Sequence, residues 1–367
     1  MQVVSPQFVL AKKVLLRYDI DVALGKGTGG RVQVIEDFKL KAGLDTLNLC
    51  LENASKVILM GHVGRPFAQA SDEEKGIPKE LSAKPIQEWF EKELGQSIDF
   101  AEDLGQAGRS TNKIVLLENI RFFHGEVPGA EYHATCTSKT CDIDFAKQLA
   151  NLVDPGQAGT GVYVNEAFSS HNKAASTTMV PKLLPHRAGL HFIKEVEVLL
   201  NVRNNPKKPF VAIMGGAKVK DKLPVINILA QKADSVLVGG KLVAEIREQN
   251  VQLPKNVMVG KLNESGFDIS EDTTSAWSGL ISKSAEIVWN GPLGKFEDPF
   301  FNQTEKIASM ILNSGAKIVI GGGDSVAALS QYGLMEKAEK VAFVSVGGGA
   351  MLKLLADGTL PTIEVLN

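Results

Sequence analysis

The chain has 367 residues and a formal net charge of −2, because 40 lysines and arginines are balanced by 42 aspartates and glutamates. This balance gives no general attraction to nucleic acid or to a membrane surface, so we expect neither as a partner and look to small molecules. The length is that of two ordinary domains, each large enough to bury its own core.

The first 16 residues include Lys12 and Lys13 and no long apolar run, which argues against a secretory signal. No later segment approaches the roughly 18 uninterrupted apolar residues of a membrane helix. The three cysteines, Cys50, Cys136 and Cys141, are too few for a disulfide framework and favour a reducing, cytoplasmic setting. Cys136 and Cys141 lie in a polar stretch without a second ligand pair, so we interpret them as solvated loop thiols.

Short apolar runs that end in glycine or a polar turn, each followed by a helical pattern, recur along the chain. Runs that are apolar at every position are typical of strands buried on both faces of a parallel sheet. Their alternation with helices predicts an α/β fold of two doubly wound, Rossmann-like parallel sheets joined by a helix. The predicted strands are residues 14–16, 57–60, 114–117, 210–214, 235–238, 287–289, 318–320 and 342–346.

Near the N-terminus, Gly25, Gly27 and Gly30 fit the spacing of a dinucleotide-binding loop. That loop requires a helix directly after it, whereas residues 31–35 alternate like a strand. We therefore predict a glycine-rich hairpin. The chain also has no Gly-Lys pair followed by Ser or Thr, so any nucleotide site does not use a P-loop.

Charged residues directly follow three predicted strands of the first half. A single arginine in such a place is often solvated or ion-paired, but the carboxyl ends of parallel strands meet at one sheet edge. Several cations there converge, and arginine suits phosphate or carboxylate through its planar fork. We therefore predict a site for a small, multiply charged anion. These residues are Arg17, Asp19, Asp21, His62, Arg65 and Arg121.

In the middle of the chain, Pro181, Pro185 and Pro206 bracket a helical pattern over residues 188–202. We predict that this helix links the two domains. The preceding segment, residues 125–161, is polar and looks like a surface excursion with one helical piece at 143–152.

The second half carries glycine-rich turns at residues 215–216, 321–323 and 347–349. Backbone amides at the start of a helix form an anion site where no Cβ atoms stand in the way. Lys218 and Lys222 are four residues apart and are predicted to share one helix face. Asp324 could hold Mg²⁺ through oxygen.

These motifs occur in the order of a known family. The chain resembles the phosphoglycerate kinases nearly from end to end. The segments that carry the resemblance are RYDIDVAL, GHVGRP, LLENIRF, YVNEAFSSH, PFVAIMGGAKVKDKL, VLVGG, IVWNGPLGKFEDP, GGGDS and VSVGGGA.

The resemblance implies a phosphotransferase with a carboxyl acceptor, which moves a phosphoryl group reversibly between 1,3-bisphosphoglycerate and ADP. It implies that residues 1–185 bind phosphoglycerate, that 186–354 bind MgATP or MgADP, and that a tail from about 355 to 367 folds back onto the first domain. We expect a monomer whose linking helix acts as a hinge. Direct transfer requires positioning and charge stabilisation, so no covalent nucleophile is expected.

The resemblance also implies site residues. Those for substrate are Asp19, Asp21, Lys39, His62, Arg65, Arg121 and Asn172. Those for nucleotide are Gly215, Ala217, Lys218, Lys222, Gly239, Asn290, Gly291, Glu297, Gly322, Gly323, Asp324 and Ser325. Glu297 would contact the ribose, and Asp324 would also hold Mg²⁺. The catalytic residues would be Lys39, Lys222, Gly323 and Gly348.

Several positions depart from the family pattern. Lys39 stands where the family has an arginine near the transferring phosphoryl, and lysine keeps the charge but not the planar fork. A second substrate arginine aligns with Asn172 or, with a shifted gap, Lys173. The other departures are Asp21 for Asn, Ala23 for Pro, Lys241 for Gly, Lys295 for an apolar residue, Ser325 for Thr and Val346 for Thr.

These departures leave two alternatives open beside a working kinase. One is a paralogue with low activity or an altered acyl-phosphate substrate. The other is a non-catalytic nucleotide-binding module on the same fold.

Overall fold

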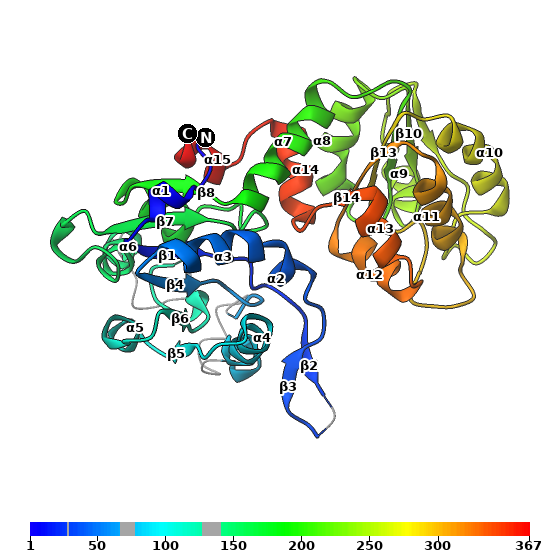
Figure 1. Cartoon of the computed structure of the whole chain (residues 1–367). Helices are drawn as coiled ribbons and strands as arrows, with labels where there is room; N and C mark the ends of the chain where they lie inside the picture. The colour runs from blue at the N-terminus through cyan, green and yellow to red at the C-terminus, as the bar shows by residue number, and fades with distance from the viewer. Residues whose placement is uncertain (28, 67–77, 127–140) are drawn as a thin grey trace. The chain divides into compact units, whose positions relative to one another are not determined.

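The computed structural model describes residues 1–27, 29–66, 78–126 and 141–367. These residues form two compact units. The first unit contains Met1–Lys194 and Leu360–Asn367, and the second contains Glu195–Thr359. Both are α/β units with a parallel sheet, as the sequence predicts (Figure 1). The binding roles predicted for residues 1–185 and 186–354 stay predictions.

The first unit contains a six-stranded parallel sheet in the order β5-β6-β4-β1-β7-β8. Every residue of β6 and β7 is buried, which places covering elements on both faces of the sheet. The strands are β1 (Lys13–Arg17), β4 (Lys56–Met60), β5 (Asp99–Ala101), β6 (Ile114–Leu117), β7 (Gly161–Asn165) and β8 (His186–Ala188).

One face of this sheet packs against two amphipathic helices, α3 (Leu44–Asn53) and α4 (Lys84–Leu94). Leu47 and Leu51 of α3 are one turn apart and join the same core as Phe90 of α4. The ring of Phe90 lies edge-on to the ring of Tyr18, with centroids 5.4 Å apart. This packing fixes the stretch of chain that leaves the end of β1.

The other helices of the first unit are α1 (Pro6–Val9), α2 (Phe38–Ala42), α5 (Leu104–Arg109), α6 (Cys141–Asn151) and α15 (Pro361–Leu366). The helix α7 (Leu190–Asn204) belongs to both units, because the division between Lys194 and Glu195 falls inside it. In the first unit the two chain ends meet, since the N-terminal ammonium donates to Oδ1 of Asn367 at 2.7 Å.

The predicted glycine-rich hairpin is confirmed. Strands β2 (Leu24–Lys26) and β3 (Val32–Val34) pair antiparallel, with Gly25 opposite Gln33. No helix follows Gly30 directly, so this turn is not a dinucleotide-binding loop.

The second unit contains another six-stranded parallel sheet, in the order β11-β10-β9-β12-β13-β14. Its strands are β9 (Phe210–Met214), β10 (Ser235–Val238), β11 (Val257–Val259), β12 (Glu286–Asn290), β13 (Lys317–Gly321) and β14 (Ala342–Val344). Its helices are α8 (Val219–Ala230), α9 (Leu242–Glu248), α10 (Glu271–Ser282), α11 (Gln303–Asn313), α12 (Gly323–Gln331), α13 (Met335–Val341) and α14 (Gly348–Asp357).

The strand orders locate the place where each sheet can bind a ligand. In the second unit the chain runs outward from β9 to β11 and then, on the other side, from β12 to β14. Connections that leave in opposite directions open a crevice at the carboxyl ends of the two central strands. That crevice lies beside Met214 and Asn290, and the equivalent position in the first unit lies beside Arg17 and Asn165.

Three sequence predictions need correction. The linking helix begins at Leu190 rather than at 188, because Ala188 ends β8 and pairs with Asn165. The predicted surface excursion over 125–161 ends at the first residue of β7, a central strand that was not predicted. Cys141 opens α6 rather than lying in a loop, while Cys136 lies outside the described residues.

No helix within the described ranges is both long and apolar enough to span a bilayer. The free thiol of Cys50 is buried, and burial raises its pKa to about 12, so it stays protonated and unreactive.

The start of α7 supplies a prediction on stability. The buried carboxyl of Glu166 accepts the backbone N–H groups of His191 at 2.9 Å and of Phe192 at 3.3 Å. Burial raises the pKa of Glu166 to about 8, against roughly 4.3 in an unfolded chain. The folded state holds this proton more tightly, so stability from Glu166 is lost as pH rises through that window.

We therefore expect Glu166→Gln to flatten the decline in urea midpoint between pH 5 and pH 8, relative to the parent chain. The exposed Glu102 is a matched control, and Glu102→Gln should leave the pH slope unchanged. Equal slopes for the parent chain and Glu166→Gln would contradict this role for Glu166.

Candidate functional site

The first unit places a buried cation at the carboxyl end of β1. Arg17 is almost fully buried, and its guanidinium donates to the carbonyl of Tyr18 at 2.9 Å. Its Nη2 lies 2.8 Å from Nδ1 of His62 and donates to Oγ of Ser170 at 3.3 Å. These three partners are neutral acceptors, so they solvate the positive charge of Arg17 without forming a salt bridge.

Other cations converge on the same place. Burial lowers the pKa of His62 well below its usual value, and the positive charges of Arg17, Arg121, Lys39 and Arg65 lower it further, in that order. The imidazole is therefore neutral at physiological pH. The four cations act on one ring, which shows that residues from four separate segments form a single positive cluster.

The position of Arg17 is fixed by a buried chain of hydrogen bonds that the sequence did not reveal. Its Nε donates to Oγ of Ser176 at 3.0 Å, and that hydroxyl donates to Oε1 of Glu126 at 2.6 Å. The backbone N–H of Ser176 donates to the other oxygen of Glu126 at 3.0 Å. Neither Ser176 nor Glu126 lies at the end of a predicted strand, so no pattern pointed to them.

The two aspartates of this cluster differ in whether their carboxylate oxygens have hydrogen-bond partners. Asp21 accepts the backbone N–H of Gly64 at 2.8 Å, and its other oxygen lies 3.7 Å from Nε2 of His62. Asp19 is only 3% exposed, and within the described ranges neither of its carboxylate oxygens has a hydrogen-bond partner. A buried acceptor without a donor is costly, so Asp19 is arranged to receive a donor such as a ligand hydroxyl.

Two more predicted residues bind backbone carbonyls beside this cluster. Nζ of Lys39, on α2, donates to the carbonyl of Asp21 at 2.9 Å, and Nη1 of Arg121 donates to that of Gly64 at 2.6 Å. The side chain of Arg65 is exposed. Asn172 also has an exposed side chain, and the described contacts do not join it to His62.

The second unit has a pocket of about 340 Å³ next to the crevice between β9 and β12. Glycine and proline backbone forms one wall, two phenylalanines form another, and charged side chains stand at the rim. The lining residues are Gly216, Ala217, Gly240, Lys241, Gly266, Phe267, Pro292, Gly294, Lys295, Phe296, Glu297 and Asp324.

A buried amide and a buried hydroxyl organise the floor of this crevice. Asn290, at the end of β12, donates to the carbonyl of Gly321 at 2.9 Å. Ser325 also donates to that carbonyl, at 3.0 Å, and accepts the N–H of Gly291 at 2.7 Å. The ends of β12 and β13 are thus tied to the first turn of α12.

Lys222 reaches the same crevice from α8. Its Nζ donates to Oδ1 of Asn290 at 3.1 Å and to the carbonyl of Gly215, which are again neutral acceptors. Burial lowers its pKa to about 8, and the opposite charge of Asp324 counters part of that shift. The prediction that Lys218 shares a helix face with Lys222 is wrong, because Lys218 precedes α8 in a left-handed conformation with φ 66°.

The predicted glycine turns do lead into helices, α12 and α14, and they touch each other. Gly322 has φ 104°, and a Cβ on Gly348 would lie 2.5 Å from its Cα. Side chains are excluded at both positions, and neither helix has a side-chain cap. The amides at these two helix starts are therefore accessible to an anion.

Comparison with known proteins agrees with this geometry. The family model described as phosphoglycerate kinase matches residues 7–258 and 243–358. A phosphoglycerate kinase of Salinispora arenicola is 34% identical over 98% of this chain and 96% of its own length, and one of Herpetosiphon aurantiacus is 32% identical over 97% and 96%.

The chain belongs to the phosphoglycerate kinase family. It is therefore a member of a family of kinases, enzymes that transfer phosphoryl groups. The structure of phosphoglycerate kinase from Coxiella burnetii aligns with a TM-score of 0.73 at 26% identity, covering 98% of this chain and 96% of that one. The fold is also that of the Pyrococcus horikoshii enzyme, with a TM-score of 0.77 at 24% identity and the same coverage.

The pocket of the second unit holds two of the three lysine departures from the family pattern, Lys241 and Lys295. Nζ of Lys295 lies 3.4 Å from the carboxylate of Asp298 and 5.7 Å from the ring centroid of Phe267. Lys241 is exposed at the residue before α9. Phe267, which sequence reasoning missed, is 56% exposed and presents an aromatic wall to the pocket.

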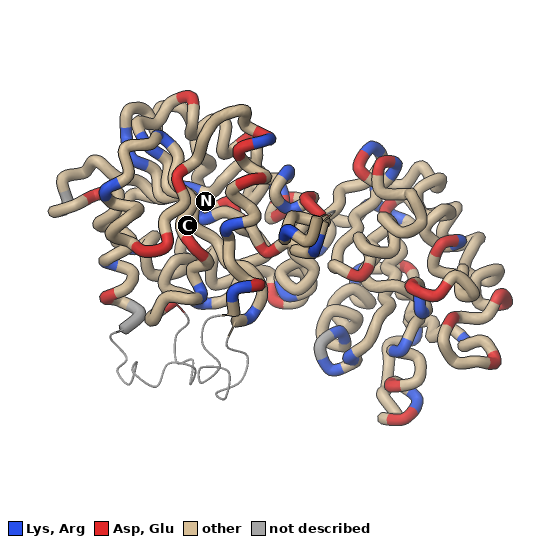
Figure 2. The backbone as a smooth tube through the Cα atoms, turned by 90° about the horizontal axis from the view of Figure 1, so that it is seen from below, with Lys and Arg blue, Asp and Glu red and all other residues tan. Residues whose placement is uncertain are grey.

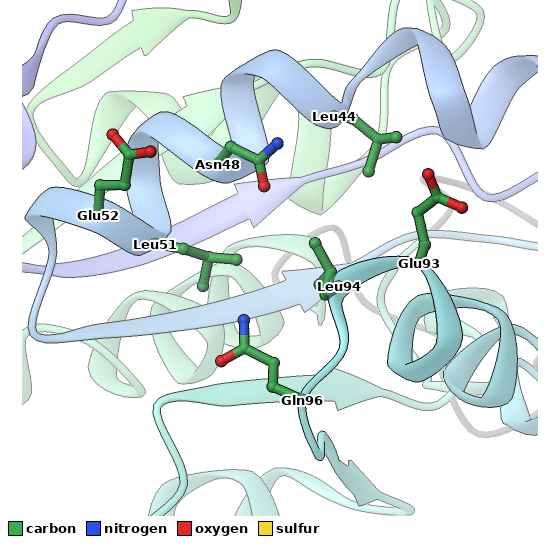
Figure 3. Close-up of a pocket in the computed structure, with 7 residues that line it drawn as sticks. All are labelled: Leu44, Asn48, Leu51, Glu52, Glu93, Leu94 and Gln96. Atoms are coloured by element: carbon green, nitrogen blue, oxygen red, sulfur yellow. The ribbon is translucent and has the colours of Figure 1, made fainter.

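A second pocket, of about 360 Å³, lies between α3 and the end of α4 (Figure 3). It has no cation and no glycine turn, so it does not have the chemistry of a phosphate site. Its lining residues are Leu44, Asn48, Leu51, Glu52, Glu93, Leu94 and Gln96. Elsewhere, positive and negative residues are interspersed along the backbone of each unit (Figure 2).

The hydroxyl of Ser325 leads to a prediction about the stability of the crevice in the second unit. Ser325→Ala leaves the N–H of Gly291 without its partner, so we expect the free energy of unfolding to fall by about 1–3 kcal/mol in chemical denaturation. Ser325→Thr keeps the hydroxyl and serves as the matched control. An alanine variant as stable as the parent chain would show that the hydroxyl does not tie these strands together.

Proposed function

We propose that this chain catalyses reversible phosphoryl transfer between 1,3-bisphosphoglycerate and ADP, giving 3-phosphoglycerate and ATP. Family membership supports the reaction. The observation that carries the assignment to this chain is the pattern of its buried and partly buried cations. The described hydrogen bonds of Arg17, Lys39, Arg121 and Lys222 all go to neutral acceptors, which leaves their charge available to anionic substrates.

In the first unit, the cluster around His62 binds the phosphate and carboxylate groups of phosphoglycerate. Arg65 and Arg121 supply forked donors, and neutral His62 supplies a hydrogen bond. Asp19 accepts the substrate hydroxyl, which gives its buried oxygens the donor they lack. Lys39 stabilises charge on the phosphoryl group as it moves, and Asn172 lies at the edge of the substrate site.

In the second unit, the pocket binds the nucleotide. Glu297 at the rim accepts from the ribose hydroxyls, and the amides of Gly323 and Gly348 donate to the phosphates. Lys222 contacts the phosphates and the phosphoryl group in flight. The transfer needs no covalent intermediate on the protein, because charge stabilisation and alignment lower the barrier.

Mg²⁺ is the metal expected with the nucleotide, and the donor set fits it. Within the described ranges, no group of three or more His, Cys, Asp or Glu side chains forms a metal cage. Asp324 is one carboxylate at the pocket, which is what Mg²⁺ needs when phosphate oxygens and water complete its shell. When bound, the ion would neutralise charge on the phosphates.

Because the two substrates are assigned to different units, we propose that closure about α7 brings them together and excludes water. We also propose that the protein acts as a monomer in the cytoplasm, where its small phosphorylated substrates and its few reduced cysteines belong. The comparisons do not favour a paralogue of altered substrate or a non-catalytic nucleotide-binding module.

The function is tested by a coupled assay with 3-phosphoglycerate and MgATP. We expect turnover in the parent chain and a loss of roughly 10²-fold or more in kcat for Lys222→Ala, because a preorganised charge donor is removed. ATP binding without turnover in the parent chain would instead support the binding module. An unchanged kcat in Lys222→Ala would contradict the role of that lysine.

The lowered pKa of Lys222 predicts that the activity falls at high pH. Its pKa of about 8 means that the ammonium of the free enzyme loses its proton as pH rises through 8. We expect kcat/KM for the nucleotide to fall along that limb in the parent chain and the limb to be absent from Lys222→Ala.

Lys39 supplies a separate prediction, because it occupies the place of an arginine. Lys39→Arg should keep or raise kcat, since it restores a forked donor, whereas Lys39→Ala should nearly abolish turnover. Lys41, on the same helix, is half exposed and paired with Asp37, so Lys41→Ala is the control. If Lys39→Ala turns over like the control, Lys39 does not contact the transferring group.

A further inference from the structure

The N-terminus of α8 is closed by a carboxylate from the following helix. Glu245 lies in the first turn of α9, and its Oε1 accepts the backbone N–H of Lys218 at 3.0 Å. Its Oε2 accepts the N–H of Val219 at 2.7 Å. One side chain thus satisfies two amides at the start of α8 and places a negative charge at the positive end of that helix.

The start of α9 also holds the chain that leads into α8. The N–H of Leu242 donates to the carbonyl of Gly216 at 3.1 Å, and the N–H of Gly216 donates to the carbonyl of Pro292 at 2.7 Å. The connection between β9 and α8 is therefore tied to α9 at two separate points, one on either side of Ala217.

One of these two points includes a residue in a strained backbone conformation. Lys218 has φ 66° and ψ 71°, in the left-handed region that disfavours residues with a Cβ by roughly 1–2 kcal/mol. Such a conformation persists only where neighbouring structure holds it. The two bonds of Glu245 go to Lys218 itself and to the next residue, so this carboxylate is the group that holds the turn.

The position of Lys222 depends on that turn. Val219 is the first helical residue of α8, so Lys222 lies in the first turn, where an uncapped helix frays. From there its Nζ reaches Gly215 and Asn290 in the crevice. Because Glu245 already accepts hydrogen bonds from two amides at the start of α8, these amides are not free to bind a phosphate. The phosphate would instead bind the two lysines and the uncapped starts of α12 and α14.

We infer that Glu245 is a positioning residue of the nucleotide site: by closing the start of α8, it holds Lys218 and Lys222 in place for the phosphates of MgADP or MgATP. Glu245 itself contacts no substrate. This inference rests on the function proposed above, and it adds a residue that neither the motifs nor the resemblance identified.

The test compares Glu245→Ala with Glu245→Gln, which keeps the length and one acceptor oxygen. The control is Glu248→Ala, because Glu248 lies on the same helix and is exposed. We would measure the Kd of MgADP by calorimetry, and kcat and KM with 3-phosphoglycerate and MgATP. Glu245→Ala should raise the Kd roughly 3- to 30-fold and lower kcat, as expected for the loss of a helix cap. Glu245→Gln should recover part of both.

Folding is checked by urea denaturation of each variant, and the glutamine variant carries the comparison if the alanine variant does not fold. A Kd and kcat equal to those of Glu248→Ala would overturn the inference. A tighter MgADP complex in Glu245→Ala would also overturn it, because the freed amides of α8 would then be a phosphate site that Glu245 blocks. If the parent chain binds MgADP without turnover, the proposed function fails while the Kd comparison still tests Glu245.

Discussion

The constraint on which both sites depend is the cost of burying a positive charge that forms no direct salt bridge. An isolated buried cation is unfavourable by several kcal/mol unless protein groups solvate it. Arg17 and Lys222 are both solvated by carbonyl, hydroxyl, imidazole or amide groups rather than by carboxylates. This arrangement holds each side chain in place without a direct salt bridge, and the carboxylates of Glu126 and Asp324 offset the two charges only from further away. An anion can therefore gain an interaction that a salt bridge would already have used.

The sheets decide where these cations stand. A parallel strand that is buried on both faces is mostly apolar along its length, but its carboxyl end opens into the crevice at the point where strand order reverses. Arg17 is the last residue of β1 and Asn290 the last of β12, so each lies at such an end. The hydrogen-bonded chain through Ser176 and Glu126 is the supporting structure that lets Arg17 stay there. A buried cation at such a strand end lowers the stability of the fold. The extensive apolar packing of both sheets offsets this loss.

The sequence predicted the features that follow from local pattern. Strands β6, β9 and β10 were predicted to the residue, because each is an uninterrupted apolar run that ends at a polar residue or glycine. Strand β7 is as long as β9 but was missed, because its first residue, Gly161, was assigned to the polar segment before it. For the site, motif order identified the charged residues around His62, but Ser176, which accepts from Arg17, and Glu126, which accepts from Ser176, lie about 160 and 110 positions from Arg17 along the chain. Such contacts arise only from the tertiary fold, so spacing could not reveal them.

In the second unit, single residues decide which helix starts have backbone amides free to bind an anion. α10 is capped by Ser270, whose hydroxyl accepts the N–H of Thr273, and so offers nothing to an anion. α8 is closed by Glu245, whereas α12 and α14 follow Gly322 and Gly347, which have no side chain to offer as a cap. Amides that the chain leaves uncapped in a crevice must be satisfied by water or by a ligand. The choice of glycine at two helix starts and of carboxylate or hydroxyl at two others therefore determines which helix starts keep uncapped amides at this edge of the sheet.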